Sequence, residues 1–306
     1  MHDIVIIGGG PAGMTAALYA VRNGKSALVL EKGGFGGQIT YSPRVENFPG
    51  SLTMSGNEFA DKMLEQILAQ GAEVEVETVT GIKDEGEIKR ILTEGGTEYE
   101  ARAVIIATGV KHRMLGLKGE NELVGNGISF CALCDGEYYR GQTVAVAGGG
   151  NSALQEATLL ADVCKEVVMV QDLDFFTGEE TLANALLSRQ NVRALTGTTI
   201  EEIVTEEGTL RGLKLRKKAT DEVIELLCDG LFVAIGLIPE NGAFSSLVPL
   251  DKAGYIDSGE DCETGCPGIF SAGDCRRKRV RQLATAAGDG AVAALAACEY
   301  INKNFK

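Results

Sequence analysis

The chain has 306 residues, a length typical of two domains, and its formal net charge of −14 argues against a nucleic-acid-binding protein. Hydrophobic residues make up 44% of it, enough for ordinary cores, and the 40 glycines indicate many tight turns rather than disorder. A strand predicted at residues 3–7 leaves no room for a signal peptide, and no apolar stretch approaches membrane-spanning length. We therefore expect a cytoplasmic protein without membrane association, whose eight cysteines are redox-active or buried thiols.

The first predicted unit is a strand, a glycine turn, a helix and a second strand. The apolar run 3–7 is typical of a buried strand, and the turn Gly8-x-Gly10-x-x-Gly13 leads into a helix expected at 14–22. The next strand, 27–30, ends at Glu31. Glycines allow close backbone approach, a helix N-terminus attracts a pyrophosphate, and an acid can bind ribose hydroxyls. The unit therefore predicts a dinucleotide site, with an accidental glycine turn as the alternative.

The region up to residue 120 contains a second glycine-rich loop at 33–37, an amphipathic helix at 57–69 and short acidic β segments from 73 to 100. A buried strand over 104–109 ends in a turn. Residues 111–120 are polar and contain glycine, so we interpret them as a linker into a second domain.

Two cysteines stand close together just before the second glycine turn of the chain. Cys131 and Cys134 have two residues between them, and Asp135 follows directly. Such thiols can close a small disulfide, and one can hold the other as a more acidic thiolate. The adjacent carboxyl group can carry the proton that thiol–disulfide exchange must move. Half of a metal site and an inert pair are the alternatives, but the sequence has neither a second CxxC nor a histidine cluster.

The second unit repeats the first. A strand at 143–147 leads into Gly148-x-Gly150-x-x-Ala153, a helix to about 162 and a strand at 166–170. Gln171 stands as far after Gly148 as Glu31 stands after Gly8. After Pro239 the chain is expected to return to the first domain, with a strand and turn at 268–274 and an alanine-rich helix at 284–300.

These patterns predict an α/β fold with two Rossmann-like, three-layer nucleotide-binding domains, the second inserted into the first. The predicted FAD-type domain is split over residues 1–113 and 243–306. The inserted redox-disulfide domain, which resembles an NAD(P)-binding domain, takes up residues 114–242.

The motifs, in this order, resemble the low-molecular-weight thioredoxin reductases. They are GGGPAG, GGQIT, VENFPG, ATG, CALCDG, GGGNSA and GDC with RQLATAAGDG, and they span nearly the whole chain. The resemblance implies a homodimer that binds FAD, no metal, and thioredoxin as the partner. It implies that Cys134 faces the flavin, that Cys131 attacks the partner disulfide and that Asp135 is acid and base. The residues that it assigns to FAD are Gly8, Gly10, Pro11, Ala12, Gly13, Glu31, Lys32, Gly36, Gly37, Gln38, Asn47, Thr108, Gly109, Gly273, Asp274, Arg281, Gln282 and Leu283.

One stretch departs from this family. Ordinary members use NADPH, and the arginines of a His-Arg-Arg-x-x-x-Arg pattern hold its 2′-phosphate. Here residues 171–177 read QDLDFFT, with no arginine and two aspartates. A charge-assisted hydrogen bond is worth ~1.5–3 kcal/mol, so losing two costs about 3–6 kcal/mol, or about two to four decades in affinity. NADPH is therefore not the expected electron donor.

Two interpretations of the donor remain open. The enzyme uses NADH, with Asp172 on the ribose, or it takes electrons from a protein, as the ferredoxin-dependent flavin thioredoxin reductases do. The chain most resembles this pyridine-nucleotide-independent branch. A basic cluster after Asp274 favours reduced ferredoxin because ferredoxins are acidic, although such charges can also serve flavin phosphate, the dimer or a solvated loop. Its members are Arg276, Arg277, Lys278, Arg279 and Arg281.

The sequence thus predicts an FAD-dependent thioredoxin-disulfide reductase driven by reduced ferredoxin. The alternatives are an NADH-dependent thioredoxin reductase and, in another class, a flavin-binding redox sensor or docking protein. The six other cysteines are interpreted as unreactive, with Cys262 and Cys266 as a candidate accessory redox pair.

Overall fold

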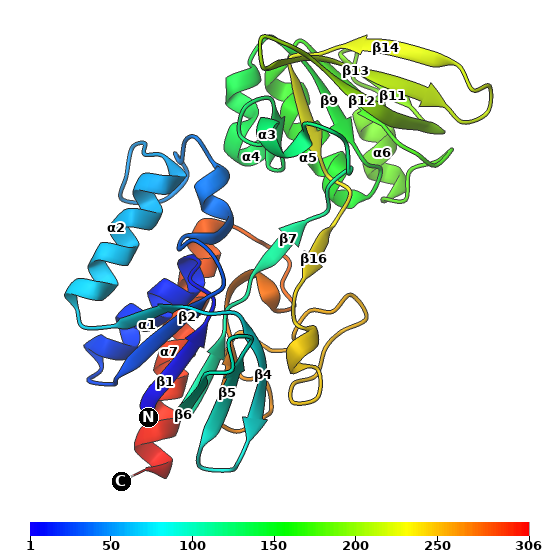
Figure 1. The fold of residues 1–306 in the computed structure, drawn as a ribbon. Helices are drawn as coiled ribbons and strands as arrows, with labels where there is room; N and C mark the ends of the chain where they lie inside the picture. The colour runs from blue at the N-terminus through cyan, green and yellow to red at the C-terminus, as the bar shows by residue number, and fades with distance from the viewer. Residues whose placement is uncertain (306) are drawn as a thin grey trace. The chain divides into compact units, whose positions relative to one another are not determined.

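The computed structural model describes residues 1–305. The chain divides into two compact units, Met1–Lys111 with Ile238–Lys306, called unit 1, and His112–Leu237, called unit 2. The chain passes between them in β7 (Val110–His112) and β16 (Leu237–Pro239), which pair with each other (Figure 1). The predicted domain boundaries lie within a few residues of these, and the role of each domain stays a prediction.

Unit 1 is built on a seven-stranded sheet of order β3-β2-β1-β6-β5-β4, with β17 also paired to β6. Strands β1, β2, β3, β6 and β17 run parallel, whereas β5 is antiparallel to both β4 and β6. The strands are β1 (His2–Ile7), β2 (Ala27–Glu31), β3 (Glu73–Val76), β4 (Val79–Asp84), β5 (Lys89–Thr93), β6 (Glu98–Ile106) and β17 (Ile269–Ser271).

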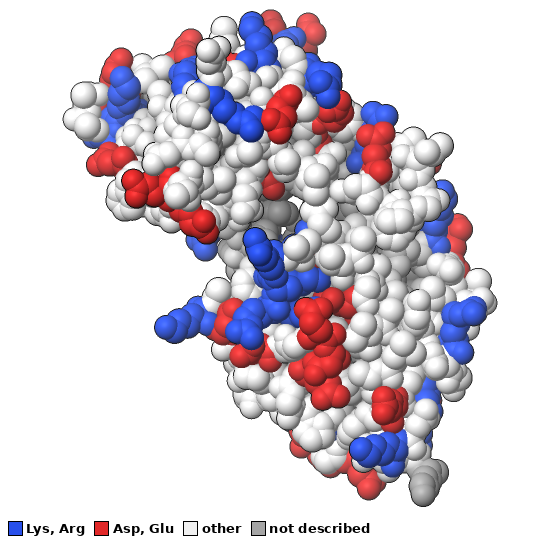
Figure 2. All heavy atoms as spheres, turned by 180° about the vertical axis from the view of Figure 1, so that it is seen from behind, with Lys and Arg blue, Asp and Glu red and all other residues white. Residues whose placement is uncertain are grey.

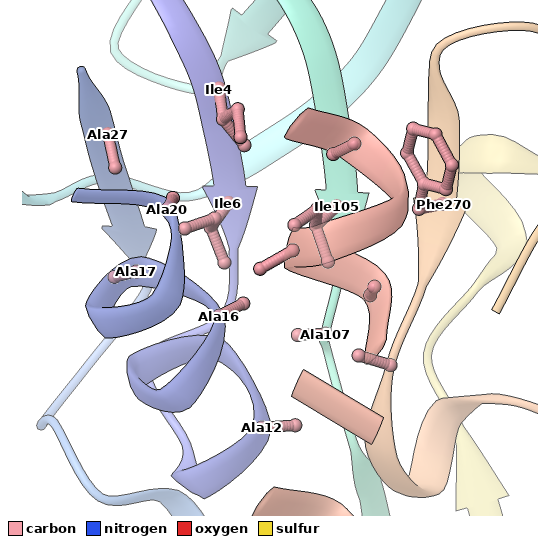
Figure 3. Packing of buried hydrophobic residues seen from close by; sticks show 14 of the residues in the cluster. Ile4, Ile6, Ala12, Ala16, Ala17, Ala20, Ala27, Ile105, Ala107 and Phe270 are labelled. Atoms are coloured by element: carbon pink, nitrogen blue, oxygen red, sulfur yellow. The ribbon is translucent and has the colours of Figure 1, made fainter. Parts of the chain in front are cut away.

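Alanines let two helices approach one face of this sheet closely. Helices α1 (Pro11–Arg22) and α7 (Leu283–Asn304) pack over Ile4, Ile6 and Ile105, and Figure 3 shows the small side chains of α1 turned toward the strands. Helix α2 (Gly56–Ala69) starts with a capping box between Ser55 and Glu58. The opposite face packs against the segment 244–256, so unit 1 has three layers.

Unit 2 repeats this layering on a smaller scale. Its parallel sheet has the order β11-β10-β9-β15-β8, with α5 (Asn151–Val163) and α6 (Glu180–Leu187) packed on one face. A three-stranded antiparallel sheet, β12-β13-β14, packs on the other. The strands are β8 (Ile128–Ser129), β9 (Thr143–Ala147), β10 (Glu166–Val170), β11 (Val192–Leu195), β12 (Thr198–Glu206), β13 (Thr209–Lys217), β14 (Val223–Leu227) and β15 (Gly230–Val233).

The remaining elements are short. They are α3 (Glu120–Leu123), α4 (Ala132–Asp135) and the 3₁₀ turns η1 (Gly37–Tyr41), η2 (Gly136–Tyr139), η3 (Gly242–Phe244) and η4 (Gly273–Cys275). Among residues 1–305, no helix combines the length and apolar character needed to cross a membrane.

The structure confirms the predicted α/β fold of two Rossmann-like units, but the predicted linker over residues 111–120 is wrong for most of its length. Glu120 is only 2% exposed, and its carboxylate accepts the backbone N–H groups of Leu115, Gly116 and Leu117. The side chains of Leu115 and Leu117 pack against the core of unit 2. The polar composition suggested an exposed linker, but the carboxylate of Glu120 is buried, because backbone N–H groups take the place of water as its hydrogen-bond donors.

Candidate functional site

The first glycine turn leaves backbone uncovered at the start of α1 in unit 1. Gly8 has φ 112°, and a Cβ at residue 13 would lie 1.9 Å from the Gly8 carbonyl oxygen, so both positions require glycine. A Cβ at residue 10 would meet only the Gly36 carbonyl oxygen, at 3.9 Å. The backbone at Gly10 is therefore exposed to a ligand at the N-terminus of α1, which starts with Pro11.

Glu31 joins this turn to the loop after β2. Its Oε2 accepts the Gly9 N–H at 2.6 Å, and its Oε1 accepts the Gly33 N–H at 2.9 Å. Lys32, which follows, forms an ion pair with Glu240. The carboxylate therefore ties the glycine turn to the end of β2, and its predicted contact with the ribose of FAD stays a prediction.

Further predicted cofactor residues lie on loops around the same unit. Gln38 donates its side-chain amide to the Val110 carbonyl oxygen, and Thr108 Oγ1 donates to Asn241 Oδ1 at 3.0 Å. Asn47 Nδ2 donates to Gln282 Oε1 at 3.3 Å, and Gln282 is the N-cap of α7. These contacts bring segments far apart in the sequence together within unit 1.

Asp274, on η4, is a buried carboxyl group without a complete set of partners. Burial raises its pKa to about 6, and its Oδ1 has no hydrogen-bond partner among residues 1–305. The preceding Gly273 has φ 79° and donates its N–H to Asp289. Because buried polar atoms are normally hydrogen-bonded, the orphaned oxygen indicates a polar ligand group.

The predicted redox pair forms a disulfide in unit 2. Cys131 and Cys134 are bonded, with a Cα–Cα distance of 5.3 Å, and Cys131 is the N-cap of α4. The Cys134 N–H points at Cys131 Sγ, at 3.1 Å. A sulfur held against a backbone N–H at a helix start is favoured as a thiolate once the disulfide opens.

Asp135 lies where the sequence predicts an acid, beside this pair. Its Oδ2 accepts the Ser129 hydroxyl at 2.6 Å, while its Oδ1 is buried with no hydrogen-bond partner in the described chain. Burial raises its pKa, and the hydrogen bond from Ser129 opposes that shift. A raised pKa makes this carboxyl group a better proton acceptor than an ordinary aspartate, as a general base requires. Sequence reasoning did not single out Ser129, which no pattern marks.

The second glycine turn in unit 2 is covered by its own chain. Gln171 is 5% exposed, and its side-chain amide lies against Gly149. The Gly149 carbonyl oxygen accepts the N–H groups of Thr177 at 2.8 Å and Gly178 at 3.0 Å. Asn151, the first residue of α5, accepts the Glu179 N–H at 2.7 Å and donates to the Glu179 carboxylate at 3.3 Å.

The basic cluster after Asp274 is not the free patch that the sequence suggests. Arg276 is 3% exposed and donates twice to Asp289, at 2.7 and 2.9 Å, and Lys278 donates to the same carboxylate at 2.8 Å. Arg277 pairs with Asp257 at 3.0 Å. Arg281 stacks on the Tyr255 ring at 4.3 Å. On the face drawn in Figure 2, basic side chains lie beside acidic ones.

The remaining cysteines give no second redox pair. Cys262 and Cys266 are both free thiols, and their sulfurs face the Asp289 carbonyl oxygen at 3.6 Å and the Asp84 carboxylate at 3.7 Å. Burial raises the pKa of Cys262 to about 12, which disfavours the reactive thiolate form. Residues 1–305 contain no group of His, Cys, Asp and Glu side chains that could hold a metal ion.

Comparison with known proteins places these features in a family. A family model described as pyridine nucleotide-disulphide oxidoreductase matches residues 2–290. The thioredoxin reductase of Listeria monocytogenes is 40% identical over 303 residues, covering 99% of this chain and 95% of the relative. That of Bacillus subtilis is 38% identical over 303 residues, covering 99% and 96%.

Solved structures of thioredoxin reductases have a fold similar to that of this chain. The thioredoxin reductase from Streptococcus pyogenes has a TM-score of 0.94 at 37% identity and covers 99% of both chains. That from Giardia duodenalis has a TM-score of 0.92 at 31% identity, covering 98% of this chain and 99% of its own.

Thioredoxin reductases of this family bind FAD, and unit 1 fits that cofactor. The open backbone at Gly10 suits a diphosphate, and the unpartnered Asp274 oxygen suits a ligand hydroxyl. The match over residues 2–290 and the identities over almost the whole chain show that this chain belongs to the pyridine nucleotide-disulphide oxidoreductases, and among them to the low-molecular-weight thioredoxin reductase family.

Proposed function

We propose that the protein is an FAD-dependent thioredoxin-disulfide reductase that receives its electrons from reduced ferredoxin rather than from NADPH. The disulfide between Cys131 and Cys134, with the buried Asp135 beside it, carries the reductase part of this proposal. We also propose that it works as a homodimer in the cytoplasm.

The residues of unit 1 would hold FAD, which once reduced would supply the electron pair that opens the Cys131–Cys134 disulfide. With one proton from the solvent, the opened pair has Cys131 as a thiolate and Cys134 as a thiol. The Cys131 thiolate attacks one sulfur of the thioredoxin disulfide, which forms a mixed disulfide and releases the other sulfur as a thiolate. Asp135 takes the proton of Cys134, whose thiolate attacks Cys131 and breaks the mixed disulfide. The second thioredoxin sulfur leaves as a thiolate, and the pair is again oxidised. Both released thiolates take protons, one from Asp135 and the other from the solvent.

The region that would hold the 2′-phosphate of NADPH supports a different donor. Asp172 and Asp174 occupy the segment in which the family has arginines. The carboxylate of Glu179 is hydrogen-bonded to Asn151, where α5 begins and a dinucleotide pyrophosphate would bind. Lost arginine contacts alone account for about two to four decades in affinity, and three nearby carboxylates add repulsion.

NADH remains the second candidate, because the tight turn is retained. Gly148 has φ 126°, like the corresponding Gly8 in unit 1. The side chain of Asp172 is 61% exposed and pairs with Lys218 at 3.4 Å, so it is accessible to a ribose. Against NADH stands the neutral, buried Gln171 at the position where unit 1 has Glu31.

The basic cluster supports ferredoxin as the electron donor less strongly than the sequence alone suggests. Arg276 and Lys278 are engaged by Asp289, which leaves Arg277 and Arg279 as the exposed charges. Two exposed arginines can steer an acidic partner only modestly at physiological salt. The donor proposal therefore rests mainly on residues 171–179.

The decisive experiment follows flavin absorbance anaerobically while NADH, NADPH or chemically reduced ferredoxin is added, with thioredoxin reduction measured in parallel. Ferredoxin should bleach the flavin and drive thioredoxin reduction, while both nicotinamides fail. Robust turnover with NADH would instead establish the second candidate. A flavin that can be reduced without any thioredoxin reduction would identify a sensor or docking protein.

A gain-of-function variant tests the donor region directly. The substitutions Asp172→Arg, Leu173→Arg and Thr177→Arg restore the arginines of the family pattern. The triple variant should gain NADPH affinity by about two decades or more. The single change Lys218→Ala, which removes only the partner of Asp172, is the matched control and should gain none.

A further inference from the structure

A carboxyl group on α5 binds the backbone of the segment that carries the redox disulfide. Glu156 accepts the backbone N–H of Ala132, the residue that follows Cys131 and begins α4. Ala132 is 5% exposed, so this N–H would otherwise be buried without a partner. The contact spans 24 positions of the sequence and ties the dithiol segment to the helix that follows the second glycine turn.

Glu156 shares its surroundings with Asp135. Burial raises the pKa of Glu156 to about 7; the Ala132 N–H opposes this shift and the Asp135 carboxylate adds to it. Burial likewise raises the pKa of Asp135. On η2, burial raises the pKa of Tyr139 to about 12, so this phenol stays neutral and adds no charge. Two coupled carboxyl groups thus adjoin the redox segment, because Asp135 directly follows Cys134 and Glu156 binds the amide of the residue after Cys131, and each responds to the charge of the other.

Reduction changes the charge at this place. Opening the S–S bond with two electrons yields two sulfur anions. One of them takes a proton and becomes a thiol, and the other stays a thiolate on the segment whose Ala132 amide binds Glu156 and which Asp135 continues. A new negative charge raises the pKa of a neighbouring carboxyl group, so a second proton is bound when the disulfide opens.

We propose that Glu156 is a positioning residue of the redox pair, which holds the Ala132 amide in place and takes up a proton when the disulfide is reduced. This inference rests on the proposed reductase function, because the electrons that open the disulfide come from the reduced flavin. Glu156 keeps the local charge from growing as a thiolate forms. It acts on the sulfurs through the backbone and through its charge, without touching the target.

The substitution Glu156→Gln separates the two roles. A glutamine oxygen still accepts the Ala132 N–H, but the side chain cannot ionise. Glu156→Leu removes both the acceptor and the charge. Glu137→Gln, at an exposed carboxylate paired with Arg140, is the matched control that removes a charge nearby.

The readout is the redox equilibrium of Cys131 and Cys134 in the FAD-loaded protein. Parent and variants are equilibrated with a dithiol buffer over roughly pH 6 to 8.5, and thiols are trapped by alkylation and counted by mass spectrometry. At about pH 6, Glu156 is protonated and as neutral as glutamine, so parent and Glu156→Gln should agree. Above pH 7 the parent binds up to one extra proton on reduction. Its equilibrium constant should therefore fall more steeply, by up to about tenfold more per pH unit.

By about pH 8.5 the glutamine variant should be easier to reduce than the parent by on the order of tenfold, and Glu137→Gln should match the parent throughout. If Glu156→Gln follows the parent at every pH, Glu156 only anchors the backbone and the inference is wrong. If the parent disulfide cannot be reduced at all, the proposed function fails instead. Should Glu156→Leu not fold, the glutamine variant alone still decides.

Discussion

Asp289, on α7, holds the loop that presents Asp274, and its removal should strongly destabilise unit 1. The carboxylate is 8% exposed and accepts four hydrogen bonds. Two come from Arg276, one from Lys278 at 2.8 Å and one from the Gly273 backbone at 3.0 Å. Asp289→Ala leaves two buried cations and a buried N–H without their acceptor.

Removing one member of a buried ion pair costs about 3–5 kcal/mol, because the remaining charge stays out of water. For a unit of this size, that loss corresponds to a fall in the unfolding temperature of about 6–20 °C. The matched control is Arg277→Ala, whose side chain is 65% exposed and pairs with Asp257. An exposed pair contributes at most about 1 kcal/mol, so this variant should stay close to the parent.

Two units need not unfold together, so the assay must report on unit 1 alone. Hydrogen exchange of peptides from β1 and β6, read by mass spectrometry, gives the free energy of opening of their sheet. A loss below about 1 kcal/mol in Asp289→Ala would refute the argument that the carboxylate compensates two buried cations. The same variant should also bind less flavin, because Gly273 and Asp274 lose their anchor.

The pH dependence of the stability difference between the parent and Asp289→Ala tests the same argument a second time. Burial pushes the pKa of Asp289 upward, but the hydrogen bonds from Arg276 and Lys278 outweigh burial and hold it below its usual value. A depressed carboxyl pKa contributes stability above the unfolded value, and that stability is lost as pH falls through the folded pKa. The difference between parent and Asp289→Ala should therefore shrink in acid. A difference that stays constant down to the lowest accessible pH contradicts the ionic origin.

Three further predictions concern the flavin, the thiols and acid stability. Gly10→Ala should fold like the parent but bind flavin with an affinity lower by on the order of tenfold or more, because its methyl group points toward the ligand at the start of α1. Flavin absorbance measures binding, and circular dichroism checks the fold. Cys134→Ser should keep its flavin yet reduce no thioredoxin with chemically reduced enzyme, since Cys131 loses its partner; parent-rate turnover would disprove the assignment. His112 stacks on Phe130 at 4.3 Å, and burial lowers its pKa to about 4, so its contribution to stability is lost as pH falls from about 6.5 toward 4. His112→Phe should abolish this loss of stability in acid. Urea unfolding at several pH values measures the free energy of unfolding of the parent and the variant.

Local sequence determined the fold and the chemistry of this chain. Residue 13 must be glycine because a Cβ there would meet the carbonyl oxygen of Gly8 in the same turn, and the strand and helix around the turn follow from apolar periodicity. The spacing of Cys131 and Cys134 allows a disulfide because residues three positions apart at the start of a helix lie close together, here with a Cα–Cα distance of 5.3 Å. Such features depend on neighbours in the chain, so the sequence was sufficient to predict them.

Only the tertiary structure decided the partners of buried charges. Arg276 and Lys278 look like a docking surface in the sequence, but α7 brings Asp289 against both and takes them out of solvent. Glu156 carries no motif, yet the packing of α4 on α5 sets it against the Ala132 amide. The cost of burying a charge depends on which acceptor lies within hydrogen-bond distance, and that distance is fixed by packing between segments that no local pattern relates.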